Sequence, residues 1–210
     1  MIFTEWIGRA LRSGRRKGES NDMARKQPVD PVSDAGGVRP ILSGVQDRLA
    51  MTPGMMKLMA GSPSVLGGYL GFSAALASGV LDAKFREAIA LAVSRANQCE
   101  ASVALHSEIA RKIGMTEGEI ISNQCCQSDD GRRAAALKFV SQLVVWRGQV
   151  TQEAVFRVRN AGYGDAEIVE IAAHVAMVTL ANCLECMPAG EMEVGGPLAP
   201  QKSLPGESPA

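Results

Sequence analysis

Four side chains that can do chemistry lie close together in the stretch EAIALAVSRANQCEASVALHSEIARKIG, which runs from Glu87 to Gly114. Cys99, Ser102 and His106 follow one another at spacings of three and four residues, so they share one face of a predicted helix. Glu87 lies on the helix before it. A thiol, a hydroxyl, an imidazole and a carboxylate that meet where two helices pack predict cysteine chemistry assisted by a proton relay.

The expected start of this helix favours a reactive thiol. Asn97 is a suitable N-cap, and Glu100 three residues later completes a capping-box pattern. Cys99 is then expected in the first turn, where free N–H groups and the positive end of the helix dipole favour the thiolate, which is the nucleophilic form. In the alternative interpretation Cys99 is a small buried apolar residue and His106 is a core histidine, as is common for isolated residues of these types.

The elements that position these groups are predicted to be helices, with almost no strands, which makes the fold class all-α. Helices are expected to begin after Asp82, Thr116, Asp129 or Asp130, and Asp165. The segment 165–186 is apolar over most of its circumference, so it is expected to be the central helix or part of a subunit interface. The predicted helices are 43–50, 53–60, 63–78, 82–96, 98–113, 116–126, 130–147, 151–161 and 165–186.

The pattern formed by Glu87, Cys99 and His106, followed by ARKIGMT from Ala110 to Thr116, resembles the alkylhydroperoxidase D / carboxymuconolactone decarboxylase superfamily. The similarity extends over roughly residues 40 to 190. It implies an alkylhydroperoxidase D-like helical bundle that forms homo-oligomers, as trimers or hexamers. It also implies catalytic roles for the matched residues.

The sequence departs from that family at one position. In the peroxidase branch both cysteines of a C-x-x-C motif take part, the second attacking the peroxide and the first resolving it, whereas position 102 here is serine. A hydroxyl cannot cycle through sulfenic acid and disulfide. Three interpretations stay open: a peroxidase in which Cys99 is regenerated by an external thiol, a decarboxylase-like lyase in which His106 and Glu87 move protons, and a non-catalytic assembly module.

The remaining cysteines and the second histidine are interpreted as structural. Cys183 and Cys186 form a C-x-x-C at the end of a long apolar helix, where the dipole opposes a thiolate. Cys125 and Cys126 are expected to pack. His174 is expected to be a core or interface group bonded to a carboxylate or a carbonyl.

Bulk composition limits the other possibilities. The 210 residues are expected to form a flexible basic extension (1–40), one helical domain (41–187) and a disordered tail (188–210). The 22 basic and 22 acidic residues balance, so no nucleic-acid partner is expected. The predicted partners are a small hydroperoxide and an external thiol reductant. No metal or other cofactor, no membrane-spanning segment and a cytoplasmic location are expected.

Overall fold

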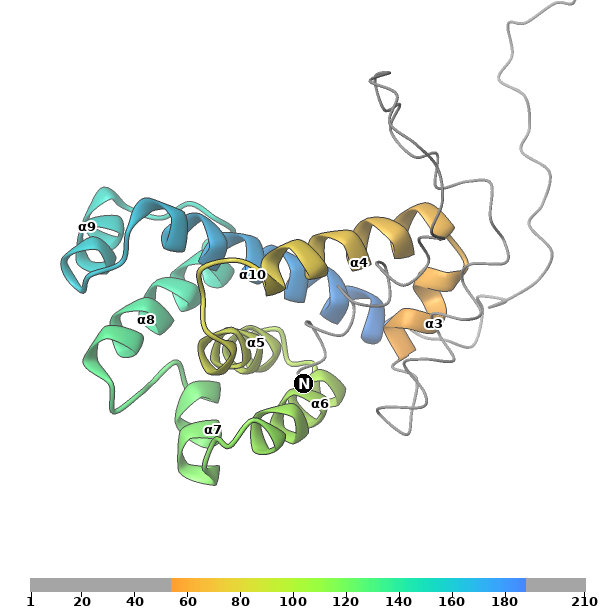
Figure 1. Cartoon of the computed structure of the whole chain (residues 1–210), viewed down its shortest axis with the longest axis horizontal. Coiled ribbons are helices and arrows are strands. Elements are labelled where there is room, and N and C mark those ends of the chain that lie inside the picture. Colours follow the sequence, from red (N-terminus) through yellow and green to blue (C-terminus); the bar gives the residue numbers. More distant parts are fainter. Residues whose placement is uncertain (1–53, 188–210) are drawn as a thin grey trace, which may run out of the picture.

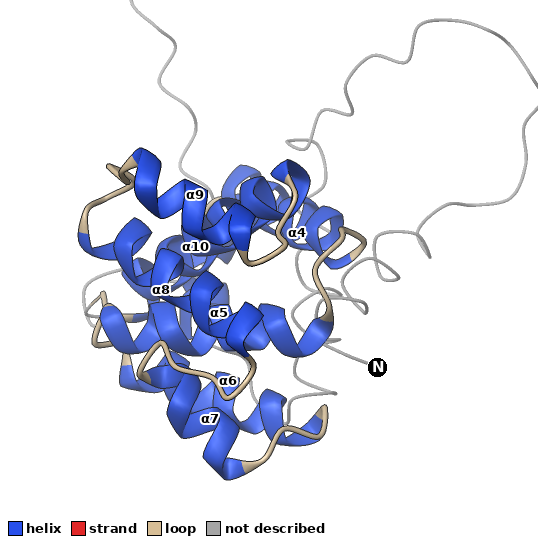
Figure 2. Ribbon diagram, turned by 90° about the vertical axis from the view of Figure 1, so that its left-hand side faces the viewer, coloured by secondary structure: helices blue, strands red, loops and turns tan. Residues whose placement is uncertain are grey.

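The computed structural model describes residues 54–187, and every regular element within them is a helix (Figures 1 and 2). The all-α prediction is therefore confirmed for this part of the chain. The expected N-terminal extension, the expected helix 43–50 and the expected tail all lie outside the described residues. The helices are α3 (Gly54–Ala60), α4 (Pro63–Ala77), α5 (Ala83–Ala96), α6 (Glu100–Lys112), α7 (Glu117–Gln124), α8 (Gly131–Val145), α9 (Gln152–Asn160) and α10 (Asp165–Glu185).

Helix α5 lies in the middle of the fold, with α6, α7, α8 and α10 packed around it (Figures 1 and 2). It is buried without interruption from Phe85 to Ser94, because the sequence FREAIALAVS offers apolar or small side chains on almost every side. Two charged residues, Arg86 and Glu87, are carried into the interior with it. Burial of charge at the centre of a helical domain requires specific partners and points to a functional cavity.

Helix α10 is the second long core element, as predicted. It contacts α3, α4, α5, α6 and α8, and it buries Ile171, His174, Val178 and Asn182. By length and composition alone this helix is long and apolar enough to cross a membrane. Its contacts on several sides are those of a core helix.

Local capping signals set most of the helix starts. The side chain of Asp82 accepts a hydrogen bond from the N–H of Phe85, Thr116 forms a complete capping box, and Asp130 accepts from Arg133. These starts are as predicted. Helix α10 instead has Gly164 as its N-cap, one residue before the predicted position, because the Glu167 carboxylate accepts from the Gly164 N–H.

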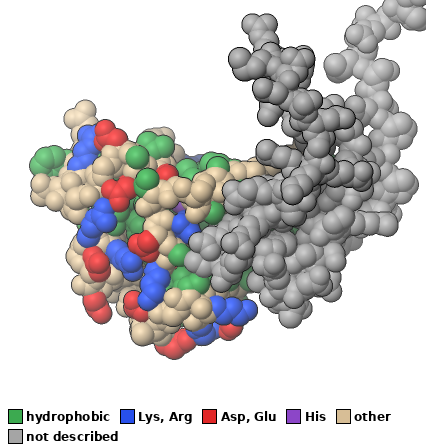
Figure 3. Space-filling view, viewed as in Figure 1, with side chains coloured by type: hydrophobic (Ala, Val, Ile, Leu, Met, Phe, Trp, Pro, Cys, Tyr) green, Lys and Arg blue, Asp and Glu red, His purple; other side chains and the backbone are tan. Residues whose placement is uncertain are grey.

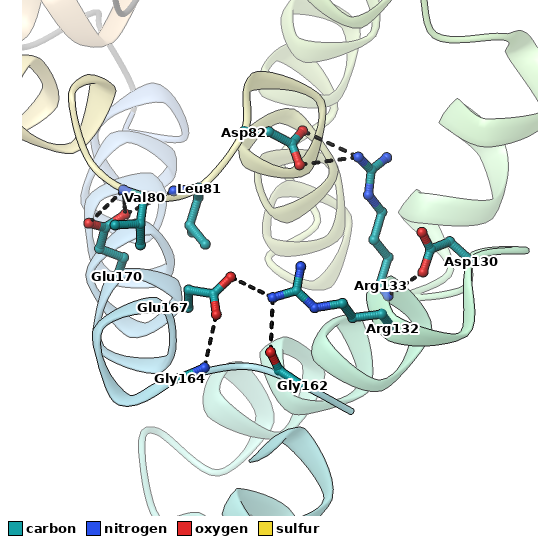
Figure 4. A network of polar contacts seen from close by, with 10 residues as sticks. All are labelled: Val80, Leu81, Asp82, Asp130, Arg132, Arg133, Gly162, Gly164, Glu167 and Glu170. Carbon is teal, nitrogen blue, oxygen red and sulfur yellow. Dashed lines mark hydrogen bonds and ion pairs between the residues drawn. The ribbon is translucent and has the colours of Figure 1, made fainter. Parts of the chain in front are cut away.

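A polar network fixes the loop before α5 onto α10 and α8 (Figure 4). The Glu170 carboxylate accepts hydrogen bonds from the N–H groups of Val80 and Leu81, at 2.9 and 3.2 Å. Arg132 on α8 pairs with Glu167 at 2.6 Å. Exposed ion pairs contribute little on their own, but together these contacts set the position from which α5 enters the core.

On the face seen in Figure 3, acidic and basic side chains are interspersed over α7 and α8, and hydrophobic side chains gather along the edge formed by α9 and α10. Mixed charge of this kind gives no extended field of one sign. Phe156 on α9 and Val169 on α10 are among the exposed large hydrophobic residues of the described part of the chain.

Candidate active site

The Glu87 carboxylate and the His106 imidazole are in direct contact. Glu87 is only 5% exposed, and its Oε2 accepts a hydrogen bond from Nδ1 of His106 at 2.8 Å. A carboxylate removed from water to this extent needs a strong donor, and the imidazole on α6 supplies it across the α5–α6 contact. Because Nδ1 is used in this way, Nε2 is the ring nitrogen left to exchange a proton with a ligand.

The Cys99 and Ser102 side chains form a second contact on α6. The buried thiol of Cys99 donates to Oγ of Ser102 at 3.2 Å. The expected position of Cys99 was wrong by two residues: Cys99 is itself the N-cap of α6, whereas Asn97 is the C-cap of α5. Gln98 takes a left-handed conformation (φ 56°) between the two helices.

The physical reason for this difference is how α5 ends. The Asn97 N–H continues the hydrogen bonding of α5 to the Val93 carbonyl, and the Cys99 N–H bonds to the Ser94 carbonyl at 3.0 Å. The backbone of Asn97 therefore belongs to the end of α5, and Asn97 does not cap α6. Glu100 forms an ion pair with Arg95 at 2.6 Å and makes no capping box.

The four predicted site residues thus form two neighbouring pairs. Ser102 and His106 are four residues apart on α6, which places them on the same helix face. Among the contacts of the described residues, none joins Cys99 or Ser102 directly to Glu87 or His106.

A small pocket of about 40 Å³ opens beside the Glu87–His106 pair. Its polar lining residues include Tyr69 and Arg86, and Cys99 and Ser102 are not part of the lining. The remaining wall is largely apolar, which is the usual character of a small-molecule site with a few placed polar groups. The full lining is Met55, Tyr69, Ser73, Arg86, Glu87, Ala90, Leu105, His106, Ile109, His174, Met177, Val178 and Ala181.

Burial shifts the pKa of two side chains that line this pocket. Burial, reinforced by the nearby Arg86 charge, lowers the pKa of His174 to about 4, so this imidazole is neutral near pH 7. Burial and the Glu87 carboxylate raise the pKa of Tyr69, so its phenol stays a hydrogen-bond donor. Arg86 donates to the Leu81 carbonyl at 2.5 Å.

The predicted bonding of His174 was wrong in one respect. The imidazole is buried in the core, at 2% exposure, but Nε2 has no hydrogen-bond partner within the described part of the chain. Glu170, one turn earlier, uses its carboxylate to bind Val80 and Leu81 instead. A buried polar atom without a partner in a pocket wall is a group available to a ligand or a water molecule.

Sequence reasoning missed one residue beside the thiol. Cys186, the C-cap of α10, was interpreted as structural, yet its thiol lies close enough to that of Cys99 to interact with it. That interaction, more than burial, raises the pKa of Cys186 to about 11. The contact between Asn182 and Ser94 brings the end of α10 to the end of α5. Each of these two residues is a small polar side chain in a largely apolar helix, and this was the only sequence signal for the contact.

The remaining cysteines lie elsewhere. Cys126 is half-buried against the core near α8, as expected, whereas Cys125 is exposed and does not pack. Cys183 is exposed on α10. Between residues 54 and 187, no group of three or more His, Cys, Asp or Glu side chains is arranged to hold a metal ion.

Comparison with known proteins agrees with this fold. Residues 63–140, which contain both residue pairs on α5 and α6, match the carboxymuconolactone decarboxylase family model. Comparison with curated proteins finds no match.

Solved structures with similar folds include an uncharacterized peroxidase-related protein from Ralstonia eutropha JMP134, described as an alkylhydroperoxidase AhpD core. It is 24% identical, with a TM-score of 0.62, over 79% of this chain and 90% of that one. An uncharacterized peroxidase-related protein from Silicibacter sp. TM1040 is 21% identical, with a TM-score of 0.64, over 81% of this chain and 97% of that one. The debrominase Bmp8, in complex with 2,3,4-tribromopyrrole, is 20% identical, with a TM-score of 0.61, over 82% of this chain and 94% of that one.

At these identities the solved structures establish the fold alone. The family model covers residues 63–140, and for that part of the chain it supports the resemblance to the alkylhydroperoxidase D / carboxymuconolactone decarboxylase superfamily seen in the sequence.

Proposed function

We propose that the protein is a thiol-dependent peroxidase that reduces small hydroperoxides through Cys99. The observation that carries the proposal is the arrangement along α6: a buried thiol bonded to Ser102, and a Glu87–His106 pair further along the same helix. Thiol attack on a peroxide needs a nucleophilic sulfur and a proton donor for the leaving alkoxide. In this proposal Cys99 is the nucleophile and His106, paired with Glu87, is the proton donor.

The reaction would run in two balanced steps. The Cys99 thiolate attacks the outer oxygen of ROOH, the O–O bond breaks, and the alkoxide leaves as ROH with a proton delivered through the imidazole of His106. The sulfur is oxidised to sulfenic acid, and the peroxide is reduced. Two equivalents of an external thiol then return Cys99 to its thiol and release water and an external disulfide. Ser102 would hydrogen-bond to the oxygen under attack.

One observation favours a second candidate function. The pocket is lined by Glu87 and His106 but not by Cys99, so its chemistry could rest on proton transfer alone. A lyase that moves protons on a small lactone acid would use His106 as the acid and base, with Glu87 orienting it. The cysteine would then have no catalytic part.

Two variants and one control separate these functions. Consumption of cumene hydroperoxide with dithiothreitol as reductant, and turnover of a muconolactone, would each be measured for Cys99→Ala, His106→Gln and Cys125→Ala. The peroxidase proposal expects peroxide consumption to be abolished in Cys99→Ala and lowered about a hundredfold in His106→Gln. Cys125→Ala, at an exposed site away from the pocket, should behave as wild type.

Peroxide consumption that survives Cys99→Ala would refute the proposal. Lactone turnover lost in His106→Gln but retained in Cys99→Ala would establish the lyase instead. Absence of both activities in the wild-type protein would leave the assembly module as the surviving interpretation.

A further inference from the structure

The C-terminal end of α10 is held against the start of α6 by a short chain of hydrogen bonds. Ser94, near the end of α5, donates through its hydroxyl to Oδ1 of Asn182 at 3.3 Å, and both residues are buried. The Ser94 carbonyl accepts from the Cys99 N–H, and the Asn182 carbonyl accepts from the Cys186 N–H, each at 3.0 Å. Figure 1 shows the end of α10 beside the α5–α6 junction, in agreement with the α10–α6 contact.

This backbone arrangement brings two cysteines near one another. Cys99 Sγ donates to Ser102, and the thiol of Cys186 lies close enough to that of Cys99 to interact with it. That interaction, more than burial, raises the pKa of Cys186, so this thiol keeps its proton. Neighbouring thiols can close to the roughly 2.0 Å of a disulfide.

The two thiols differ in their access to solvent. Cys99 is 1% exposed, whereas Cys186 is an exposed residue at the end of its helix. A reductant too large to enter the interior can therefore reach the Cys186 sulfur and not that of Cys99. This division, one shielded sulfur and one open to solvent, is what a reacting and a resolving cysteine require.

We propose that Cys186 is the resolving cysteine of this protein and takes the role that Ser102 cannot perform. The inference rests on the proposed peroxidase function. After Cys99 becomes a sulfenic acid, the sulfur of Cys186 attacks it, the Cys99–Cys186 S–S bond forms, the S–O bond breaks, and hydroxide leaves as water with the proton released by the Cys186 thiol. The two thiols are oxidised to one disulfide, and ROOH is reduced to ROH and water.

The same geometry indicates how an external dithiol reduces this disulfide. An external dithiol attacks the exposed Cys186 sulfur, and Cys99 leaves as the thiolate. The second thiol of the reductant then resolves the mixed disulfide, which restores both protein thiols and leaves the reductant as its own disulfide. The neighbouring Cys183 is also exposed on α10, and it is the matched control for this role.

Disulfide mapping tests the assignment. Wild type, Cys186→Ser and Cys183→Ser would be treated with one equivalent of cumene hydroperoxide or of diamide, alkylated, digested and analysed by mass spectrometry. A Cys99–Cys186 disulfide is expected in wild type and in Cys183→Ser. In Cys186→Ser the Cys99 sulfenic acid should accumulate and be trapped by dimedone, and turnover with a dithiol should fall at least tenfold.

The two oxidants separate this inference from the function on which it rests. If hydroperoxide oxidises Cys99 but neither oxidant yields the Cys99–Cys186 disulfide, Cys186 is not the resolving residue and the peroxidase proposal stands. A disulfide between Cys183 and Cys186 in wild type, with Cys99 left as sulfenic acid, would also overturn the assignment. If diamide yields the Cys99–Cys186 disulfide but hydroperoxide leaves Cys99 unmodified, the pair is redox-active and the peroxidase function is wrong.

Discussion

Burial of His174 makes the stability of the protein dependent on pH in a way that can be calculated. In an unfolded chain this imidazole would titrate near its ordinary pKa of 6.5, whereas in the folded protein its pKa is lowered to about 4. As the pH falls through 6.5, the unfolded state binds a proton that the folded state does not, so stability is lost. The full loss, reached below about pH 4, is roughly 3 kcal/mol, and about 2 kcal/mol of it falls between pH 7 and pH 5.

Urea denaturation of wild type and of His174→Gln at several pH values measures this term. The variant is expected to be less stable than wild type near pH 7, since it repacks a buried side chain. The difference in unfolding free energy between the two proteins should then shift by about 2 kcal/mol in favour of the variant as the pH falls from about 7 to about 5. Parallel pH profiles for the two proteins would refute the reasoning, because they would show that His174 is protonated equally in both states.

Three further predictions concern the site and the surface. Glu87→Gln should lower kcat/KM for hydroperoxide about a hundredfold and alter its pH profile, because the imidazole loses a charged partner at 2.8 Å; an unchanged profile would contradict the relay. Ser102→Cys places a second sulfur where a hydroxyl now lies 3.2 Å from Cys99 Sγ, so peptide mapping after oxidation should find a disulfide within the motif in place of the one to Cys186. We also propose a homo-oligomer, and Phe72→Glu, at an exposed apolar position on α4, should lower the mass measured by light scattering; a monomeric wild-type protein would contradict this.

The helices were predictable because their signals are local. Thr116 and Asp130 cap their helices as their sequence context predicts, and observed ends differ from predicted ones by one or two residues. The contact between His106 and Glu87 also follows from pattern, since each lies on the buried face of its own helix. Periodicity and capping together are enough to specify these features.

What the sequence could not supply depends on contacts between distant segments. Cys186 meets Cys99 because α10 returns across the α5–α6 junction, and no local pattern fixes where a helix of that length ends in space. The N-cap of α6 was assigned to Asn97 because its residue type favours that role, but α5 extends far enough to use its N–H. In each case tertiary structure overrode a correct local preference.

The most direct test of the central claim compares single-cysteine proteins. One variant would retain Cys99 alone and the other Cys125 alone, an exposed thiol away from the pocket that serves as an internal reference. Stopped-flow measurement of their reaction with cumene hydroperoxide should give a second-order rate constant at least tenfold larger for the Cys99 protein, despite its burial. Equal rate constants, or a faster reaction at Cys125, would contradict the assignment of Cys99 as the reactive thiol.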